Sequence, residues 1–332
     1  MPRNKAGDEK RGEVSPMQGK LVEVKNLKKH FTSGLFRKSY VKAVDGVSFE
    51  IGEGETFALV GESGCGKSTV GRCILRLIEP TSGEVYFNSE NILGSNGNLR
   101  ELRRKMQIIF QDGDGSLNPR MRVFDLLTEP LRVHRLINGQ SREKAAGLMK
   151  LVNLTPDLLG RYPHELSGGQ RQRIGIARAM SLNPEFVVAD EPAASLDLSV
   201  QAQMLELMKR LQAEFGISYL FISHNLNVVK LMADRVAVMY LGKLVEVGDT
   251  EKIFNGSAHP YTQALLSAVP TTDPSARRKR IVLKGEIPTP LNPPSGCRFH
   301  PRCPEAMGIC SEIEPRLQEI GTGHSVACHF AP

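Results

Sequence analysis

The sequence contains no uninterrupted apolar stretch near the ~20 residues that a membrane-spanning helix needs. The apolar runs FVVA, SYLFIS and RVAVMYL are far shorter and are typical of buried parallel strands. Residues 1–19 are polar and charged, so we expect a disordered segment there rather than a signal peptide. These absences predict a cytosolic chain that takes any path through a membrane from partner subunits.

The features of a nucleic-acid-binding protein are also missing. The net charge is +7, with basic runs at 102–105 (LRRK) and 277–280 (RRKR). No aromatic interleaving or base-reading motif accompanies these runs. We therefore expect solvated charge near an anionic membrane face, and no nucleic-acid partner. The length of 332 residues suits a large α/β body with an appendage.

A glycine-rich loop follows a predicted strand and precedes a predicted helix. The segment GESGCGKST at 61–69 fits the P-loop pattern, between GETFALV and TVGRCILRLI. Its glycines let successive backbone N–H groups point at phosphate oxygens. Lys67 is expected to neutralise the β- and γ-phosphates, and Ser68 to ligate Mg²⁺. The predicted contacts to ATP are therefore Gly61, Glu62, Ser63, Gly64, Cys65, Gly66, Lys67, Ser68 and Thr69.

Two adjacent carboxylates follow a second apolar strand. FVVAD at 186–190 ends in Asp190, and Glu191 comes next. Asp190 is suited to act on Mg²⁺ through water, and Glu191 to polarise the water that attacks the γ-phosphate. The structural alternative is that both carboxylates cap the helix after Pro192.

Four further motifs occur in a fixed order. Gln111 ends the apolar segment MQIIFQ, LSGGQ follows at 166–170, ASLD at 194–197, and His224 ends SYLFISH. With the P-loop and FVVADE, these motifs make the chain resemble the nucleotide-binding subunits of ATP-binding-cassette (ABC) machines.

The resemblance implies an α/β fold, namely a RecA-like P-loop core with a mixed edge sheet. It places an ABC ATPase domain at 20–255, with a helical subdomain at about 115–180 that carries the LSGGQ signature. A small extension rich in cysteine and proline follows at 256–332.

The resemblance also implies roles for individual residues. Gln111 reaches Mg²⁺ or the attacking water, and its loop touches a membrane-spanning subunit. Ser167 and the N–H groups of Gly168 and Gly169 form an anion site at a helix start. That site meets the γ-phosphate of ATP bound by a second ABC ATPase subunit, whereas His224 contacts the γ-phosphate in its own chain. The implied catalytic residues are Glu191, His224, Gln111 and Lys67, and Gln170 and Asp197 join the nucleotide contacts.

Adenine needs a flat platform, because the P-loop reads only phosphates. The family places an aromatic residue in the first strand region. Phe31 in LKKHF fits best, and Tyr40 is the alternative.

The segment 256–332 is rich in proline and contains HPYTQALL at 259–266. It resembles the C-terminal extension of the ATPase subunits that drive dipeptide, oligopeptide and nickel import. The resemblance implies a peripheral place on the cytoplasmic face of the inner membrane. The implied partners are a second ATPase subunit, two transmembrane permeases and an extracytoplasmic peptide-binding protein. A homodimer, a nickel or other small-solute importer, and a soluble ABC ATPase of repair or translation are the alternatives.

Four cysteines lie in this segment, namely Cys297, Cys303, Cys310 and Cys328. Disulfides are disfavoured in a cytosolic chain, so clustered thiolates indicate a metal. Four thiolates fit a [4Fe–4S] cluster or a zinc ion, but zinc sites commonly use a close C-x2–4-C pair, which is absent. The importer resemblance implies the iron–sulfur cluster, and reduced thiols remain an alternative. One ligand could instead come from His300, His324 or His329.

Overall fold

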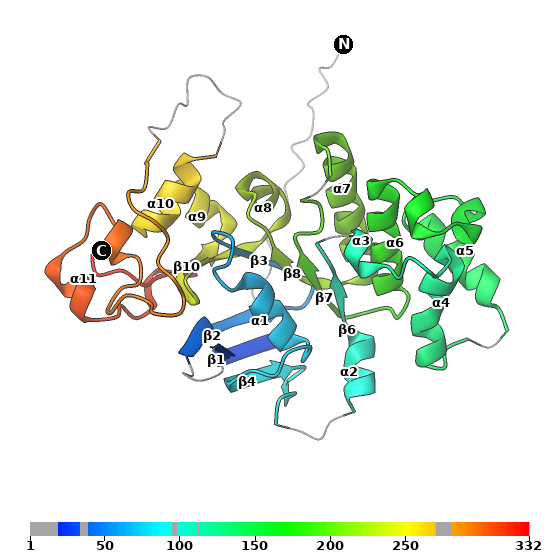
Figure 1. Ribbon diagram of the computed structural model, residues 1–332, viewed down its shortest axis with the longest axis horizontal. Helices are drawn as coiled ribbons and strands as arrows, with labels where there is room; N and C mark the ends of the chain where they lie inside the picture. The colour runs from blue at the N-terminus through cyan, green and yellow to red at the C-terminus, as the bar shows by residue number, and fades with distance from the viewer. Residues whose placement is uncertain are drawn as a thin grey trace, which may run out of the picture.

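The fold is built on two β-sheets (Figure 1). The computed structural model describes residues 19–33, 39–94, 98–111, 113–137, 139–194, 196–269 and 280–331. In spatial order the smaller sheet contains β2 (Ser39–Gly52), β1 (Lys20–Ser33), β4 (Ser82–Phe87) and β5 (Glu90–Asn91). The larger sheet contains β11 (Gln318–Gly321), β12 (His324–Val326), β10 (Lys243–Asp249), β9 (Arg235–Tyr240), β3 (Thr56–Val60), β8 (Ser218–Ile222), β7 (Phe186–Asp190) and β6 (Met106–Ile109).

Five strands of the larger sheet, from β9 through β3, β8 and β7 to β6, run parallel. Both faces of this parallel part are buried, as expected for strands that read as continuous apolar runs. In β3, Phe57 and Leu59 enter one core cluster, whereas Ala58 and Val60 enter the other. Because side chains alternate across a strand, the sheet separates two hydrophobic layers.

Helices fill the two layers differently. Helix α1 (Lys67–Ile74) shares its core cluster with the smaller sheet, so it lies between the two sheets. The opposite face is covered by α7 (Leu198–Phe215), α8 (Leu226–Met232) and α6 (Gly168–Met180). Asp197 caps the start of helix α7, and Gly216 follows its last residue in the left-handed conformation (φ 67°). The P-loop, which joins β3 to α1, thus leaves the centre of the larger sheet.

A group of helices extends beyond β6, on the right of Figure 1. It contains α3 (Gly113–Ser116), α4 (Val123–Val133), α5 (Ser141–Leu151), the short 3-10 turns Pro156–Gly160 and Pro163–Glu165, and α6. Helix α2 (Leu99–Lys105) leads into β6. Among the described residues, no helix has the length and apolar character to cross a membrane.

Part of the C-terminal segment extends the larger sheet. Strand β12 pairs antiparallel with β10, with Gly248 opposite His324, and β11 pairs with β12. The described residues of this region include the helical elements α9 (Thr250–Gly256), α10 (Pro260–Ser267), the 3-10 turn His300–Arg302 and α11 (Gly308–Glu312). The two strands are short and polar, so their sequences QEIG and HSV carry no alternation long enough to predict them.

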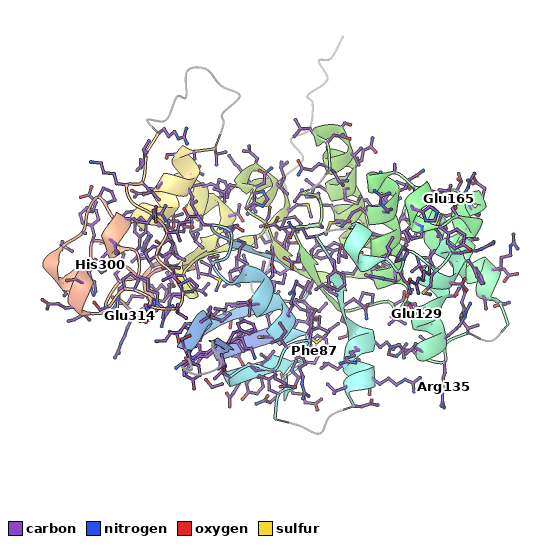
Figure 2. The ribbon with its side chains drawn as sticks, viewed as in Figure 1. Phe87, Glu129, Arg135, Glu165, His300 and Glu314 are labelled. Carbon is purple, nitrogen blue, oxygen red and sulfur yellow. The ribbon has the colours of Figure 1, made fainter. Side chains whose placement is uncertain are left out.

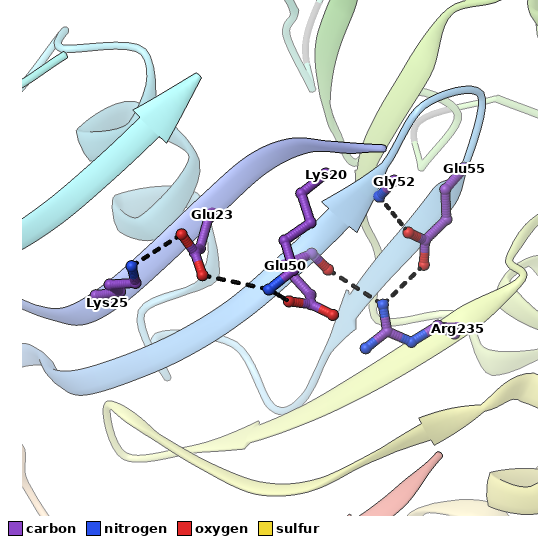
Figure 3. Close-up of polar contacts among 7 residues, drawn as sticks. All are labelled: Lys20, Glu23, Lys25, Glu50, Gly52, Glu55 and Arg235. Atoms are coloured by element: carbon purple, nitrogen blue, oxygen red, sulfur yellow. Dashed lines mark hydrogen bonds and ion pairs between the residues drawn. The ribbon is translucent and has the colours of Figure 1, made fainter. Parts of the chain in front are cut away.

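An ionic network fixes the turn between β2 and β3 (Figure 3). Glu55 accepts from the Gly52 N–H at 2.5 Å and pairs with Arg235 of β9 at 3.2 Å. Burial raises the pKa of the Glu55 carboxyl. Alongside, Lys20 pairs with Glu50 at 2.5 Å on the exposed edge of the hairpin. The buried contact ties β2 and β9 to the strand that leads into the P-loop.

An aromatic cluster attaches the tail to the cassette. Phe299 is 1% exposed, and its ring centroid lies 5.3 Å from those of Tyr240 and Tyr261. We expect Phe299→Ala to lower the free energy of unfolding by about 3–5 kcal/mol, because it removes a large buried ring. Phe330→Ala, at a ring that is 52% exposed, should change it by less than about 0.5 kcal/mol. Urea unfolding of the two variants measures the difference, and equal values would show that the cluster does not hold the tail.

Candidate nucleotide site

The P-loop backbone adopts a conformation that requires glycine at two positions. Gly66 has φ +110°, and a Cβ there would lie 2.0 Å from the carbonyl oxygen of Ala43. Gly61 has φ +150°, and its Cβ would lie 2.2 Å from the carbonyl oxygen of Met239. Both contacts are shorter than any side chain tolerates, so β2 and β9 press against the loop and set its curvature.

Lys67 closes this loop from inside. Its ammonium donates to the carbonyl oxygens of Gly61 at 2.8 Å and Glu62 at 3.0 Å. The residue is 5% exposed and begins α1, where the first N–H groups of the helix have no intrahelical partners. A buried cation and free amides at one helix start form a site for an anion such as phosphate.

Next to Lys67 in the sequence, Ser68 pairs with Asp190, and both side chains carry oxygen atoms that can bind a metal ion. The Ser68 hydroxyl, on α1, donates to Oδ1 of Asp190, at the end of β7, at 2.8 Å. Burial raises the pKa of the Asp190 carboxyl, and the hydrogen bond from Ser68 opposes that rise. Mg²⁺ prefers oxygen ligands and is commonly held by one or two protein groups together with substrate phosphates. This donor set fits Mg²⁺.

Glu191 is the centre of a second polar cluster. Gln111 Nε2 donates to Glu191 Oε2 at 3.1 Å, and His224 Nδ1 lies 3.0 Å from the same oxygen. Glu191 has φ +47°, and its own N–H donates to the Ile222 carbonyl at 2.9 Å. A non-glycine residue held in this left-handed region is a recurrent feature of functional sites.

The ends of three strands bring this cluster together. Gln111 and His224 each lie two residues beyond the end of β6 and β8, so the prediction that they end these strands is wrong. The carboxyl ends of parallel strands meet at one edge of the sheet, where ligands bind in open α/β folds. The alternative in which Asp190 and Glu191 cap the next helix is excluded, because Asp197 caps α7.

The signature residues begin α6 with a reciprocal cap. Ser167 Oγ accepts from the Gln170 N–H at 3.3 Å, and the Ser167 N–H donates to Gln170 Oε1 at 2.9 Å. The Gln170 amide oxygen is therefore used within the helix start. Ser167 and Gly168 are exposed. Figure 2 shows Glu165, just before the signature, and His300 of the tail at opposite ends of the longest axis.

Asp197 also caps a helix, because its side chain binds the first N–H groups of α7. Its Oδ1 accepts from the N–H groups of Ser199 at 3.1 Å and Val200 at 2.9 Å. A Cβ on Gly169 would lie 2.8 Å from the Val200 side chain, so the segment after Asp197 lies beside the signature helix. Ser195 of the same motif lies outside the described residues, as do residues 1–18 and 277–279.

The two candidate adenine platforms lie on opposite faces of the β1–β2 ribbon. Phe31 is opposite Val41, and Tyr40 is opposite Thr32. Directly opposed residues share a face and neighbours alternate, so Phe31 and Tyr40 point to different sides. Phe31 is 38% and Tyr40 51% exposed. Only one of them can therefore stack on a given adenine.

The four tail cysteines are free thiols, and the structure does not support the predicted cluster. Among the described residues, no group of three or more His, Cys, Asp or Glu side chains is arranged to hold a metal ion. Cys297 donates its N–H to the Cys310 carbonyl at 2.8 Å, so these two are neighbours through their backbones. Burial, followed by the charges of the neighbouring cysteines, raises the pKa of Cys297 to about 11 and also raises that of Cys303.

The histidines proposed as substitute ligands are used elsewhere. His324 Nε2 lies 2.8 Å from Oε1 of the buried Glu246. His300 Nδ1 lies 2.9 Å from the Cys297 carbonyl oxygen, and His329 Nε2 lies 2.9 Å from the Ile313 carbonyl oxygen. Cys65 and Cys73 are buried, and burial raises the pKa of Cys73 to about 11.

One contact set at the P-loop was not predicted from the sequence. Arg302 and Tyr261, both in the tail, bind Glu62. Tyr261 belongs to the HPY triplet, which drew attention only through the family resemblance. Nothing local in the sequence around Arg302 indicates a partner 240 residues away.

These features together define the class of protein, which is an ATP-hydrolysing cassette with an α/β fold. They are the P-loop that follows a central parallel strand, the two oxygen groups suited to Mg²⁺ and the glutamate held at the sheet edge. Residues 44–194 match the family described as ABC transporter, and residues 245–310 match the family described as oligopeptide/dipeptide transporter, C-terminal region. The chain belongs to the ABC transporter ATP-binding proteins, in the group that carries this C-terminal region.

Relatives support this placement over nearly the whole chain. The chain is 51% identical over 322 residues to the oligopeptide transport ATP-binding protein AppF of Bacillus subtilis (strain 168), covering 94% of this chain and 98% of the relative. It is 51% identical over 317 residues to the dipeptide transport ATP-binding protein DppF of Escherichia coli (strain K12), covering 94% and 95%.

A solved structure, the dimeric post-hydrolysis state of the ATP-binding cassette MJ0796 bound to ADP and Pi, is 29% identical with TM-score 0.61. The match covers 69% of this chain and 98% of that chain.

Proposed function

We propose that the chain hydrolyses ATP to power the import of dipeptides or oligopeptides across the cytoplasmic membrane. The observation that supports ATP hydrolysis is that Gln111 and His224 both contact the same carboxylate oxygen of Glu191. The peptide half is supported by the match of residues 245–310 and by the names of the relatives.

The phosphate-binding step uses the loop and α1. The backbone amides of residues 61–69 and the ammonium of Lys67 bind the β- and γ-phosphates, so Lys67 leaves the carbonyls of Gly61 and Glu62 as the nucleotide enters. Ser68 and Asp190 would hold Mg²⁺, Ser68 directly and Asp190 through water. Mg²⁺ supplies charge neutralisation on the phosphates.

The hydrolytic step uses Glu191 as the general base. Its carboxylate takes a proton from the attacking water as the oxygen approaches the γ-phosphorus in line with the leaving ADP oxygen. Gln111 and His224 orient that carboxylate, and His224 is exposed enough to reach a γ-phosphate. Phe31 or Tyr40 stacks on the adenine.

The ATP site is completed by a second ABC subunit. Ser167, Gly168 and Gly169 present an exposed helix start, which meets the γ-phosphate held by the opposite chain. The dimeric state of the ADP-bound cassette described above supports this arrangement. We assign the ATPase domain to residues 20–255, with its helical subdomain at about 115–180, and the extension to 256–332.

The full machine contains two transmembrane permeases, an extracytoplasmic peptide-binding protein and a second ATPase subunit. This chain lies on the cytoplasmic face of the membrane, where the loop after Gln111 contacts a permease.

Uptake measurements test the cargo. Cells that lack the chain should lose uptake of radiolabelled dipeptide or oligopeptide and regain it with the wild-type chain. Uptake of labelled nickel, with peptide uptake unchanged, would contradict the peptide assignment. Loss of neither would contradict an import role.

A substitution in the signature tests the two-chain site. We expect Ser167→Arg to block ATP-dependent association of subunits and to lower ATP turnover by about 100-fold, because a bulky cation occupies the anion site. Binding of Mg–ADP to the chain's own P-loop should not change. The control Ser82→Arg adds the same side chain at an exposed position, the first residue of β4, and should associate as the wild type does in sedimentation analysis. Unaltered association of Ser167→Arg would refute the shared site.

A further inference from the structure

Glu62, the second residue of the P-loop, is held at three of its groups. Its carbonyl oxygen accepts from the Lys67 ammonium at 3.0 Å. Its N–H donates to the hydroxyl of Tyr261 at 2.9 Å, and its carboxylate receives two hydrogen bonds from Arg302. Two of these three contacts come from the C-terminal tail, so the loop conformation and the docking of the tail are coupled at one residue.

The Arg302 contact is a two-pronged ion pair in a sheltered place. Nη1 lies 2.8 Å from Oε2 and Nη2 lies 3.0 Å from Oε1 of Glu62. Arg302 is 9% exposed, and the Glu62 hydrogen bonds raise the pKa of its guanidinium further. Paired parallel hydrogen bonds of this kind fix orientation as well as distance. Removing the guanidinium leaves the Glu62 carboxylate without its partner.

The tail presents these two groups from a rigid base. Tyr261 is fully buried near the start of α10, and its ring centroid lies 4.7 Å from that of Tyr240. The Tyr240 hydroxyl lies 3.4 Å from Nη1 of Arg302. Tyr240 ends β9, next to the Met239 carbonyl that already presses on Gly61. The aromatic cluster therefore fixes Arg302 and Tyr261 relative to the strand that borders the P-loop.

We propose that the C-terminal tail forms part of the ATP site, with Arg302 and Tyr261 acting as positioning residues that set the P-loop through Glu62. The inference rests on the proposed binding of nucleotide by this loop. The two carbonyls that hold Lys67 belong to the peptide units on either side of the Glu62 Cα, and the first of these units also carries the N–H that binds Tyr261. Displacing Glu62 therefore displaces the resting position of Lys67. Detachment of the tail therefore weakens the binding of the β-phosphate by the P-loop and Lys67.

The test is a titration of the full-length chain with Mg–ADP, which occupies the P-loop without requiring a second subunit. Arg302→Gln should raise the Kd about tenfold, within the usual range of coupling between sites. Arg302→Lys keeps the positive charge but cannot form the two parallel hydrogen bonds of the guanidinium, so its Kd should lie between those of the wild type and Arg302→Gln. In steady-state turnover the KM for ATP should rise while kcat stays within about twofold, because the lost interaction acts on bound substrate and transition state alike.

Arg298→Gln is the matched control. Arg298 is a second buried arginine of the tail, and it binds Asp45 of β2 and the Leu241 carbonyl oxygen rather than Glu62. This variant should lower the melting temperature as Arg302→Gln does, yet leave the Kd for Mg–ADP unchanged. A double variant, Glu62→Gln with Arg302→Gln, should bind no more weakly than the weaker single variant, because the two residues act as one unit.

Three results would overturn the inference. These are a wild-type Kd in Arg302→Gln, an equal loss of affinity in Arg298→Gln, and full additivity in the double variant. Failure of the wild-type chain itself to bind Mg–ADP would instead overturn the proposed nucleotide site.

Discussion

Glu191→Gln is expected to lower ATP turnover by about 100-fold or more, the usual effect of losing a general base, and to leave nucleotide binding intact. The substitution keeps the size of the side chain and its contacts with Gln111 and His224, but the amide cannot take a proton from water. Because the γ-phosphate then stays uncleaved, ATP should accumulate on the protein. Release of phosphate, measured with the partner subunits present, and binding of Mg–ADP give the two quantities.

Glu185→Gln is the matched control for this variant. Glu185 lies just before β7, at the opposite end of the strand that leads to Glu191, and is paired with Lys105 at the surface. It should turn over ATP at the wild-type rate. Near-normal phosphate release by Glu191→Gln would remove Glu191 from the role of base, and an equal loss in Glu185→Gln would indicate a fault in β7 instead.

Much of the site could be predicted from the sequence because its contacts are local. The P-loop places Lys67 and Ser68 within one turn of a helix that follows a buried strand, and an eight-residue pattern specifies that geometry. The pairing of Ser68 with Asp190 follows from β7 lying in the same parallel sheet, whose strands read as apolar runs. The mixed edge sheet was predicted from the family resemblance and not from the periodicity of the sequence.

Other features of the site could not be predicted from the sequence. Some depend on contacts between segments that are distant in the sequence, and others depend on which of several possible partners a polar side chain binds. Arg302 meets Glu62 across 240 residues, and no periodicity records such a pair. The nucleotide contacts of Gln170 and Asp197 stay a prediction, and the structure adds that their side-chain oxygens accept from helix-start N–H groups, a competing demand of every helix. The cysteine spacing indicated a metal, whereas no group of three or more His, Cys, Asp or Glu side chains in the described part of the chain is arranged to hold one.

Lys67→Met should raise the Kd for Mg–ADP by about 10- to 100-fold, because a charged hydrogen-bond donor to phosphate contributes about 1.5–3 kcal/mol. Methionine has a similar length, so it fills the buried space without the charge. We expect kcat/KM for ATP to fall by about 1000-fold, since the charge that develops on the transferred phosphoryl group also loses its partner. Calorimetric titration and phosphate release measure the two effects on the same preparation.

Lys209→Met separates a loss of this ammonium from a general effect of the substitution. Lys209 lies on the exposed side of α7, away from the P-loop, and its variant should bind and turn over nucleotide normally. The pattern across variants then assigns the roles. Lys67→Met loses binding and turnover together, Glu191→Gln loses turnover alone, and Arg302→Gln loses affinity with kcat retained. Wild-type affinity in Lys67→Met would mean that its ammonium stays on the carbonyls of Gly61 and Glu62 and never reaches the phosphates.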